Sequence, residues 1–188
     1  IIVLAVAILP MLGVGGMQLY RAETPGPVKD NKMTPRIADT AKHLWFIYLA
    51  ITVACSLAFY VAGMDWFDAI CHAFSTVAIG GFSTYDASIG YFNSVSINMI
   101  CVVLLLLSSV NFPLHFAAIR GKSVKTYLRD PEFKAFLWIQ FLLVLVCFLV
   151  LLEEQIYPDW RSALNHGVFQ AVSMSTTAGF STASFVAW

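Results

Sequence analysis

Long uncharged runs of apolar residues alternate with polar, charged segments along the chain. The four longest runs cover residues 1–20, 44–64, 87–119 and 135–152. At about 1.5 Å per helical residue, each run covers most or all of a hydrocarbon core about 30 Å thick. The pattern therefore predicts that these runs are transmembrane helices.

Two further apolar segments are too short and too polar to be ordinary spans. Residues 66–76 carry apolar side chains at helical spacing, and residues 160–174 form a similar half-length segment. Small residues follow each segment and include the sequence Gly-Phe-Ser-Thr, at 81–84 and again at 179–182. Because glycine disfavours continued helix, each half-length helix is predicted to end in a turn.

The order of span, half-length helix, glycine turn and span therefore repeats. A shift of 98 residues superimposes the two Gly-Phe-Ser-Thr segments, whereas a shift of 94 superimposes Trp66 on Trp160 and His72 on His166. The two shifts differ by four residues, which is close to one helical turn. We expect the second half-length helix to be one turn longer than the first.

Composition supports membrane insertion, and the charges predict an orientation. Hydrophobic residues make up 59% of the chain and charged residues 12%, against about 45–50% and about 25% in soluble domains. Ten of the eleven Lys and Arg residues lie at 21–42 and 120–134, so these loops are predicted to face the cytoplasm. Both half-length helices then enter from the outer side. The basic loops also carry acidic residues, which argues against a nucleic-acid partner.

The glycine-containing segments have the composition of a cation filter built from backbone carbonyls. Non-helical backbone is tolerated at membrane depth only where protein buries it or where it lines a water-filled path. Glycine adopts the angles that turn carbonyls toward one axis, and the C-terminal end of the preceding helix favours a cation. No charged side chain lies at 77–84 or 175–182. The predicted potassium-coordinating carbonyls belong to Ala78, Ile79, Gly80, Thr176, Thr177 and Ala178, and the predicted turn glycines are Gly81 and Gly179.

These elements predict an all-α integral membrane protein with repeated units of span, re-entrant pore helix, filter and span, of potassium-channel type. Residues 1–20 are expected to be the second span of a preceding repeat, and 21–42 a cytoplasmic loop. A complete repeat follows at 43–120, with a span at 43–63, a pore helix at 66–76, a filter at 77–84 and a span at 88–120. After a loop at 121–132, the first half of the next repeat occupies 133–188, with a span at 133–152, a pore helix at 160–174 and a filter at 175–182. Because the chain begins without methionine inside an apolar run, we expect it to be a fragment.

Other interpretations remain open from the residues alone. The glycine-containing segments also fit helix-packing motifs of small residues, and they fit the broken helices of a secondary transporter that binds a small solute at mid-membrane. A membrane-embedded enzyme is disfavoured, because the chain has no H-E-x-x-H and no G-x-S-x-G motif. We expect His72 and His166 to make hydrogen bonds rather than to bind a metal, and the four cysteines to be buried apolar residues.

Three stretches carry a family resemblance: S-T-V-A-I-G-G-F-S-T-Y-D from Ser75, S-M-S-T-T-A-G-F-S-T from Ser173 and N-F-P-L-H from Asn111. With them, the whole chain resembles the Trk/Ktr/HKT superfamily of potassium transporters, and most closely its bacterial TrkH-type subunits. The resemblance implies a potassium-permeable path inside four non-identical repeats of one polypeptide. It also implies that the protein is not an enzyme and needs no cofactor besides the transported potassium ion.

The same resemblance implies a location and partners. The protein is expected to be a multi-pass protein of the bacterial inner (plasma) membrane, in contact with lipid, and to form a homodimer. A cytosolic nucleotide-binding regulatory subunit is the second expected partner. Each filter keeps one shared glycine rather than the full T-V-G-Y-G of tetrameric potassium channels, so we expect modest selectivity over sodium.

Overall fold

The computed structural model describes the backbone of residues 37–184 and the side chains of residues 43–184. Every regular element in this part of the chain is a helix, which confirms the all-α prediction. The span predicted at 1–20 and most of the loop predicted at 21–42 lie outside the described residues. The described part of the chain divides into two units, one holding residues 51–109 and 134–184 and the other residues 37–50 and 110–133.

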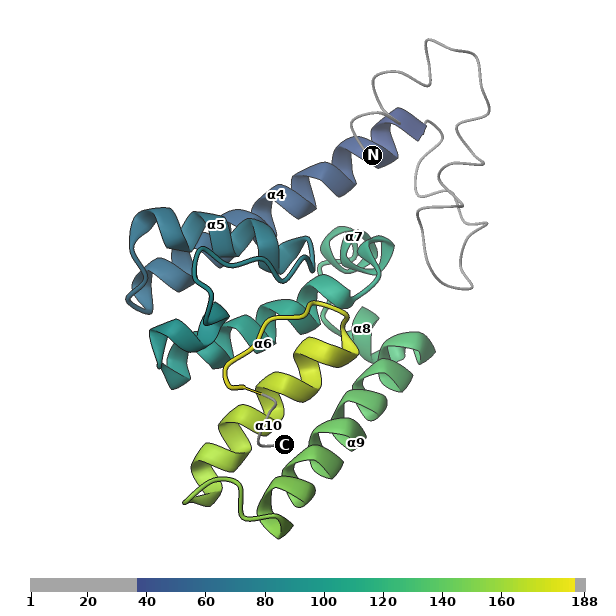
Figure 1. Cartoon of the computed structure of the whole chain (residues 1–188). Coiled ribbons are helices and arrows are strands. Elements are labelled where there is room, and N and C mark those ends of the chain that lie inside the picture. The colour runs from purple at the N-terminus through teal and green to yellow at the C-terminus, as the bar shows by residue number, and fades with distance from the viewer. Residues whose placement is uncertain (1–36, 185–188) are drawn as a thin grey trace. The chain divides into compact units, whose positions relative to one another are not determined.

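The larger unit contains both half-length helices. These are α5 (Trp66–Val77) and α10 (Trp160–Ser175), and both pack against α6 (Val95–Ser109), which lies between them in Figure 1. The core of this unit includes the fully buried side chains of Ala69, Ala73, Cys101, Leu105 and Phe169. Small side chains allow helix backbones to approach closely in apolar surroundings.

The two half-length helices differ by one turn, as the two sequence shifts predict. α5 has 12 residues and α10 has 16. Their last residues, Val77 and Ser175, are 98 positions apart, whereas their first residues, Trp66 and Trp160, are 94 positions apart. The extra turn of α10 therefore lies at its N-terminus, and the residues after both helices keep the 98-residue register.

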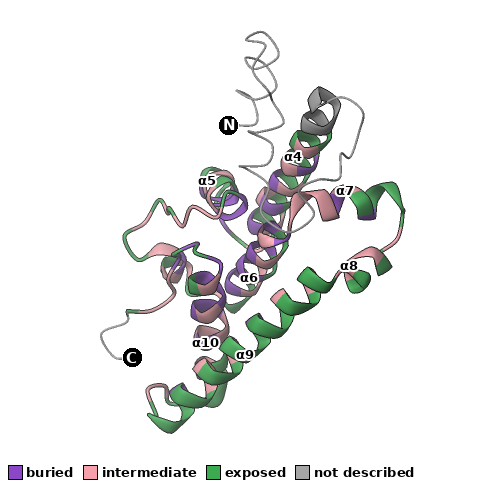
Figure 2. Cartoon of the chain, turned by 90° about the vertical axis from the view of Figure 1, so that its right-hand side faces the viewer, coloured by how far each residue is buried: buried purple, intermediate pink, exposed green. Residues whose placement is uncertain are grey.

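Two described helices are long and apolar enough to cross a membrane. They are the stretch His43–Val61 of α4 (Ile37–Val61) and the whole of α9 (Pro131–Glu153). Most of α9 is exposed in Figure 2, and Gln140 and Leu151 are its buried residues. A helix that is apolar on nearly all sides and uncovered by protein has the surface expected of a lipid-facing span.

The third predicted span, at 88–120, is not one continuous helix. It consists of a 3₁₀ turn, η1 (Ser88–Phe92), followed by α6 and then α7 (Phe112–Arg120). Asn93 has a left-handed φ of 41° after η1, and α6 ends before Pro113, which lies in the first turn of α7. Proline suits that position, because its missing N–H interrupts no helical hydrogen bond there. The helix is thus broken before this proline rather than continuous through it, and α6 and α7 form a third span only if they cross the membrane together.

Two predicted loops contain helical residues. α4 begins at Ile37, inside the loop predicted at 21–42, and the loop predicted at 121–132 contains α8 (Lys125–Arg129) and the start of α9. α9 begins early because Asp130 Oδ1 accepts the N–H of Phe133 at 2.7 Å, while Pro131 suits the first helical position. The prediction started this helix at the first apolar residue and overlooked its cap. The other helix ends differ from the predicted ones by one or two residues.

The smaller unit joins α7 to α8 and to the first part of α4. The ring of Phe116 in α7 meets that of His43 in α4 edge-on, with centroids 5.1 Å apart. The hydroxyl of Tyr127 in α8 lies 2.8 Å from Nδ1 of His115 in α7. Burial raises the pKa of the Tyr127 hydroxyl above its ordinary value.

Candidate functional site

Each half-length helix ends in a turn with the same hydrogen bonds. After α5, the N–H groups of residues 78–80 donate to carbonyls in the last turn of the helix, at 3.0, 3.1 and 2.7 Å. After α10, the N–H groups of residues 176–178 donate to the equivalent carbonyls, at 2.9, 3.0 and 2.9 Å. We call residues 78–81 the first glycine segment and residues 176–179 the second glycine segment.

Backbone angles alternate in sign along both glycine segments. Ile79 and Gly81 have positive φ values of 55° and 69°, and Thr177 and Gly179 have values of 64° and 85°. Positive φ is a genuine outlier for a β-branched residue and costs about 1–3 kcal/mol. Strain of this kind persists where the surrounding structure enforces it, and it clusters at functional sites. Its presence at equivalent positions of two repeats marks the glycine segments as a candidate site.

The turn hydrogen bonds set the direction of the carbonyls. Because a trans peptide unit is planar, the C=O of one residue points opposite to the N–H of the next. The N–H groups of residues 79 and 80 face the end of α5, so the carbonyls of residues 78 and 79 point away from it. Gly179 also donates to the end of α10, at 3.3 Å, so the carbonyls of residues 176–178 all point away from that helix. Within residues 37–184, the carbonyls of 78–80 and 176–178 accept no hydrogen bond.

The two glycine segments touch at Gly81. A Cβ atom placed on Gly81 overlaps the carbonyl oxygen of Ala178 and lies 2.9 Å from its carbonyl carbon. By contrast, no atom of the described residues lies within 4 Å of the Cβ position on Gly179. Glycine alone combines a positive φ with such a close approach. Gly81 therefore allows the two segments to lie side by side.

The residues after the first glycine segment are bonded to one face of α5. Asp68 is buried, and its carboxylate accepts the hydroxyls of Thr84 and Tyr85, both at 2.7 Å. One turn along α5, His72 donates from Nδ1 to the Asp68 carbonyl at 2.8 Å and therefore accepts the Ser83 hydroxyl at Nε2, also at 2.8 Å. The hydrogen bond to Asp68 raises the pKa of Tyr85, which keeps its hydroxyl a donor. We call residues 83–85 the first exit segment.

The second exit segment, residues 181–183, is held to α10 by different side chains at equivalent positions. His166 follows Asp68 by 98 residues, and its Nδ1 lies 2.9 Å from Oγ1 of Thr182. Gln170 donates from Nε2 to the carbonyl of Ala183 at 3.3 Å. An imidazole in the second repeat thus replaces the carboxylate of the first.

A buried hydroxyl fixes the end of the second glycine segment. Ser173 is fully buried, and its Oγ donates to the carbonyl of Phe180 at 2.7 Å. Ser75 is the equivalent residue of the first repeat, and its Oγ has no hydrogen-bond partner among the described residues. Substitution of Ser75 is therefore a matched control for substitution of Ser173.

Replacing Ser173 with alanine is expected to destabilise the full-length protein by about 1–3 kcal/mol, because the Phe180 carbonyl loses its donor. Ser75→Ala is the control and is expected to change stability by less than about 0.5 kcal/mol, because its hydroxyl makes no hydrogen bond. Thermal unfolding in detergent measures both variants. Equal unfolding midpoints for the two variants contradict this role of Ser173.

The 3₁₀ turn of the first repeat is in backbone contact with the second exit segment. Gly90 donates its N–H to the carbonyl of Ser181 at 3.0 Å, and Ser181 donates its N–H to Oγ of Ser88 at 3.2 Å. The Cβ position of Gly90 lies between 2.9 and 3.2 Å from three backbone atoms of Thr182. η1 therefore ties the two repeats together at the second exit segment.

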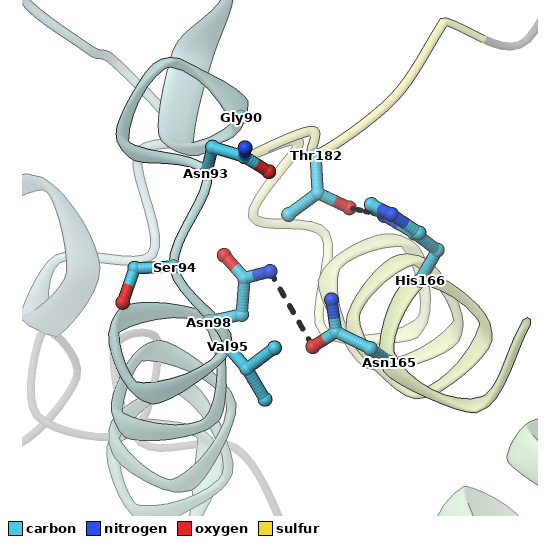
Figure 3. Close-up of a pocket in the computed structure, with 8 residues that line it drawn as sticks. All are labelled: Gly90, Asn93, Ser94, Val95, Asn98, Asn165, His166 and Thr182. Atoms are coloured by element: carbon cyan, nitrogen blue, oxygen red, sulfur yellow. Dashed lines mark hydrogen bonds between the residues drawn. The ribbon is translucent and has the colours of Figure 1, made fainter. Parts of the chain in front are cut away.

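A small polar cavity lies beside this contact (Figure 3). It has a volume of about 40 Å³ and is lined by residues of η1, α6, α10 and the second exit segment. Asn98 of α6 is buried; its Nδ2 donates to Oδ1 of Asn165 at 3.4 Å, and its Oδ1 has no partner among the described residues. A cavity needs about 10–15 Å³ of such volume to hold a water molecule, so this cavity has room for one.

The spanning helix α9 contributes one polar contact to the site. Gln140 is 6% exposed, and its Oε1 accepts the hydroxyl of Ser175 at 2.8 Å. Polar side chains within a span are costly unless they face protein or water. This hydrogen bond therefore fixes the C-terminal end of α10 against α9.

Sequence reasoning identified the glycine segments and missed most of the side chains that hold them. His72 and His166 make hydrogen bonds, as expected. Among the described residues, no group of three or more His, Cys, Asp and Glu side chains is placed to hold a metal. Asp68, Ser173 and Gln140 were overlooked. A signal for Asp68 was present, because it is the only carboxylate of α5 and lies 98 residues before His166.

These features define an all-α membrane protein with repeated half-length helices that end in strained glycine turns. The chain belongs to the TrkH family of cation transport proteins, whose family model matches residues 1–188. This assignment agrees with the resemblance carried by the sequence motifs.

Curated relatives and a solved structure match the whole chain. It is 64% identical over 190 residues to the Trk system potassium uptake protein TrkH of Vibrio parahaemolyticus, and 62% identical over 188 residues to that of Escherichia coli strain K12. Both matches cover 100% of this chain and 39% of the relative, so the chain spans well under half of their length. The crystal structure of the potassium transporter TrkH from Vibrio parahaemolyticus aligns with a TM-score of 0.81 at 57% identity, covering 100% of this chain and 37% of that chain.

Proposed function

We propose that the two glycine segments are two strands of a potassium-selective filter in a potassium uptake protein. The observation that carries this proposal is the shared alternation of φ, together with carbonyls that point away from the helix ends and accept no hydrogen bond. Carbonyl oxygens of this kind replace the hydration shell of a potassium ion. The coordinating carbonyls are those of Ala78, Ile79, Gly80, Thr176, Thr177 and Ala178, and the glycines that permit the turns are Gly81 and Gly179.

The electrostatics of the segments favour a cation that binds and leaves. α5 and α10 both end at a glycine segment, and each helix C-terminus carries about half of an elementary negative charge. The segments themselves contain no charged side chain. Partial charges and carbonyl dipoles attract a cation without the tight binding that a carboxylate cage produces, and conduction requires this balance. Potassium is the proposed ion because the relatives are named as potassium uptake proteins.

The two strands are proposed to be part of a larger ring of repeats in the parent polypeptide. Phe180 is fully buried, and its ring is stacked against His72 of α5 with centroids 6.4 Å apart. Phe82 is the equivalent residue of the first repeat and is 81% exposed. In the proposed ring, a pore helix from another repeat covers Phe82, in the same way that α5 covers Phe180.

The setting of the parent protein is also a proposal. We place it in the bacterial inner membrane, surrounded by lipid, as a homodimer that works with a cytosolic nucleotide-binding regulatory subunit. The word "system" in the names of the relatives supports a partner subunit, and the sequence resemblance supports the remainder.

The proposed filter predicts a specific effect of Gly179→Ala in the full-length parent. A Cβ at Gly179 meets no described atom within 4 Å, and a side chain there strains a φ of 85°. Strain of about 1–2 kcal/mol is expected to shift the second glycine segment and to lower the preference for potassium over sodium about fivefold to tenfold. Rubidium flux into liposomes, with potassium and sodium as competitors, measures the preference.

Gly63→Ala is the matched control for this experiment. Gly63 also has a positive φ, 106°, and open space at its Cβ position, but it lies between α4 and α5, away from both glycine segments. Backbone strain alone predicts similar effects of the two variants, whereas the filter predicts that only Gly179→Ala changes ion preference. If rubidium flux and ion preference are unchanged in Gly179→Ala, the filter assignment is wrong. If rubidium flux depends on an added small solute and shows no preference among cations, the secondary-transporter interpretation is favoured instead.

A further inference from the structure

The first exit segment is attached to α5 by an unusually dense set of hydrogen bonds. Asp68 is 5% exposed, and its two carboxylate oxygens each accept one hydroxyl, from Thr84 and from Tyr85, at 2.7 Å. Hydrogen bonds in which the acceptor is charged are about twice as strong as neutral ones and are short, as these are. Both donors lie within four residues of the end of the first glycine segment. The carboxylate therefore acts on the backbone that carries the proposed coordinating carbonyls.

His72 extends this attachment by one residue. Asp68 and His72 are four residues apart and lie on the same face of α5. His72 is fully buried, and its imidazole links the Asp68 carbonyl oxygen to the hydroxyl of Ser83, with both contacts at 2.8 Å. Ser83 Oγ also accepts the N–H of Tyr85 at 3.2 Å. Three consecutive residues, 83–85, are thereby fixed to one face of a single helix.

The second repeat does not have the same attachment. The residue equivalent to Asp68 is His166, which contacts only one hydroxyl of the exit segment, that of Thr182. Ala183 takes the place of Tyr85 and offers no side-chain donor. The polar cavity lined by Asn98 and Asn165 lies beside Thr182 instead. The carboxylate attachment therefore belongs to the first repeat, and the second repeat has no duplicate of it.

We propose that Asp68 is a positioning residue that holds the first glycine segment in its ion-selective conformation through Thr84 and Tyr85. This inference rests on the proposed filter. Ile79 and Gly81, on either side of Gly80, both have positive φ, and this backbone is prone to relax because relaxation frees Ile79 from an unfavourable φ. The hydrogen bonds of the first exit segment to α5 prevent that relaxation on the C-terminal side of the first glycine segment. The turn hydrogen bonds to α5 prevent it on the N-terminal side.

The test removes the donors first, in the full-length parent reconstituted in liposomes. Thr84→Val and Tyr85→Phe keep the shape of each side chain and delete one hydroxyl each, and both residues lie near the surface, so the protein is expected to fold. Each variant is expected to lower the potassium-over-sodium preference about threefold to tenfold, and the double variant more. Asp68→Asn, which replaces one accepting oxygen with a donor, is expected to match or exceed the double variant. Asp68→Glu restores the carboxylate and is expected to recover part of the preference.

Tyr60→Phe is the control, because it deletes a tyrosine hydroxyl from the exposed surface of α4. The readout is ion preference, measured by competition of sodium with rubidium flux, alongside the thermal unfolding midpoint. If Asp68 has only a structural role, its variants lower the thermal unfolding midpoint, and the folded protein keeps its original preference for potassium over sodium. That outcome overturns the proposal, as does an unchanged preference in both Thr84→Val and Tyr85→Phe.

Failure of this inference is distinguishable from failure of the proposed filter. If the parent shows potassium preference that Gly179→Ala lowers, while the variants of Asp68, Thr84 and Tyr85 do not lower it, the filter stands and Asp68 is not a positioning residue. If Gly179→Ala has no effect either, the filter itself is wrong.

Discussion

Gly81→Ala is expected to reduce rubidium flux through the full-length parent about tenfold or more and to remove most of its preference for potassium. Two costs combine at this residue. Alanine at a φ of 69° is strained by about 1–2 kcal/mol, and its Cβ overlaps the carbonyl oxygen of Ala178. The overlap involves backbone on both sides, so no side-chain rotation relieves it. Either the first or the second glycine segment must move, and both supply proposed coordinating carbonyls.

Gly179→Ala is the informative comparison, because it introduces the strain without the overlap. We therefore expect Gly81→Ala to have the larger effect, although the two glycines sit in identical Gly-Phe-Ser-Thr sequences. Rubidium flux is measured for both variants and normalised to the amount of folded protein in the liposomes. The ratio of the two fluxes compares the effects of the two substitutions. Equal effects indicate that a further repeat of the parent packs against Gly179 as the second glycine segment packs against Gly81, and wild-type flux in Gly81→Ala contradicts the filter.

Gly90→Ala is expected to destabilise the parent by about 1–3 kcal/mol, through overpacking between η1 and the second exit segment. Its Cβ lies 2.9, 3.1 and 3.2 Å from the O, C and Cα atoms of Thr182, all of which are backbone. The N–H of Gly90 is also bonded to Ser181, so separating the two segments breaks that hydrogen bond. We expect a lower thermal unfolding midpoint and, because the second exit segment shifts, reduced rubidium flux.

Gly167→Ala serves as the control for Gly90→Ala. The nearest atom to its Cβ position is Cδ1 of Leu151 at 3.2 Å, and the end of a leucine side chain moves more easily than backbone. A smaller loss of stability is expected there. A midpoint for Gly90→Ala that equals or exceeds that for Gly167→Ala contradicts a rigid contact between η1 and Thr182.

Elements with a strong local signal were predictable from the sequence. The run at 135–152 predicts a span because few sequences place so many apolar residues together except in contact with lipid. The glycines at the ends of the half-length helices predict turns, because glycine adopts the positive φ found at Gly81 and Gly179 without steric cost. Ile79 and Thr177 also adopt positive φ, and no local signal predicts this, because β-branched residues disfavour it.

The break between α6 and α7 was only half predictable. Pro113 indicates a kink, but a proline within a span permits either a bent helix or two helices, depending on what replaces the lost hydrogen bonds. The attachment of Thr84 and Tyr85 to Asp68 was not predictable from the sequence. The carboxylate and its two partners are 16 and 17 positions apart, and only the reversal of the chain at the glycine segment brings them together.

Local sequence signals specify the helices, the 98-residue register of the repeats and the two places where a half-length helix ends in a glycine turn. These features depend on hydrophobicity and on backbone preferences, which are local properties. The tertiary structure decided the environments of residues that the sequence makes identical. Among the described residues, Gly81 lies against Ala178 and Phe180 is buried against α5, whereas the equivalent Gly179 and Phe82 have no such neighbour. The reason is that contact and burial depend on which element lies beside a residue, and identical tetrapeptides in two repeats have different neighbours.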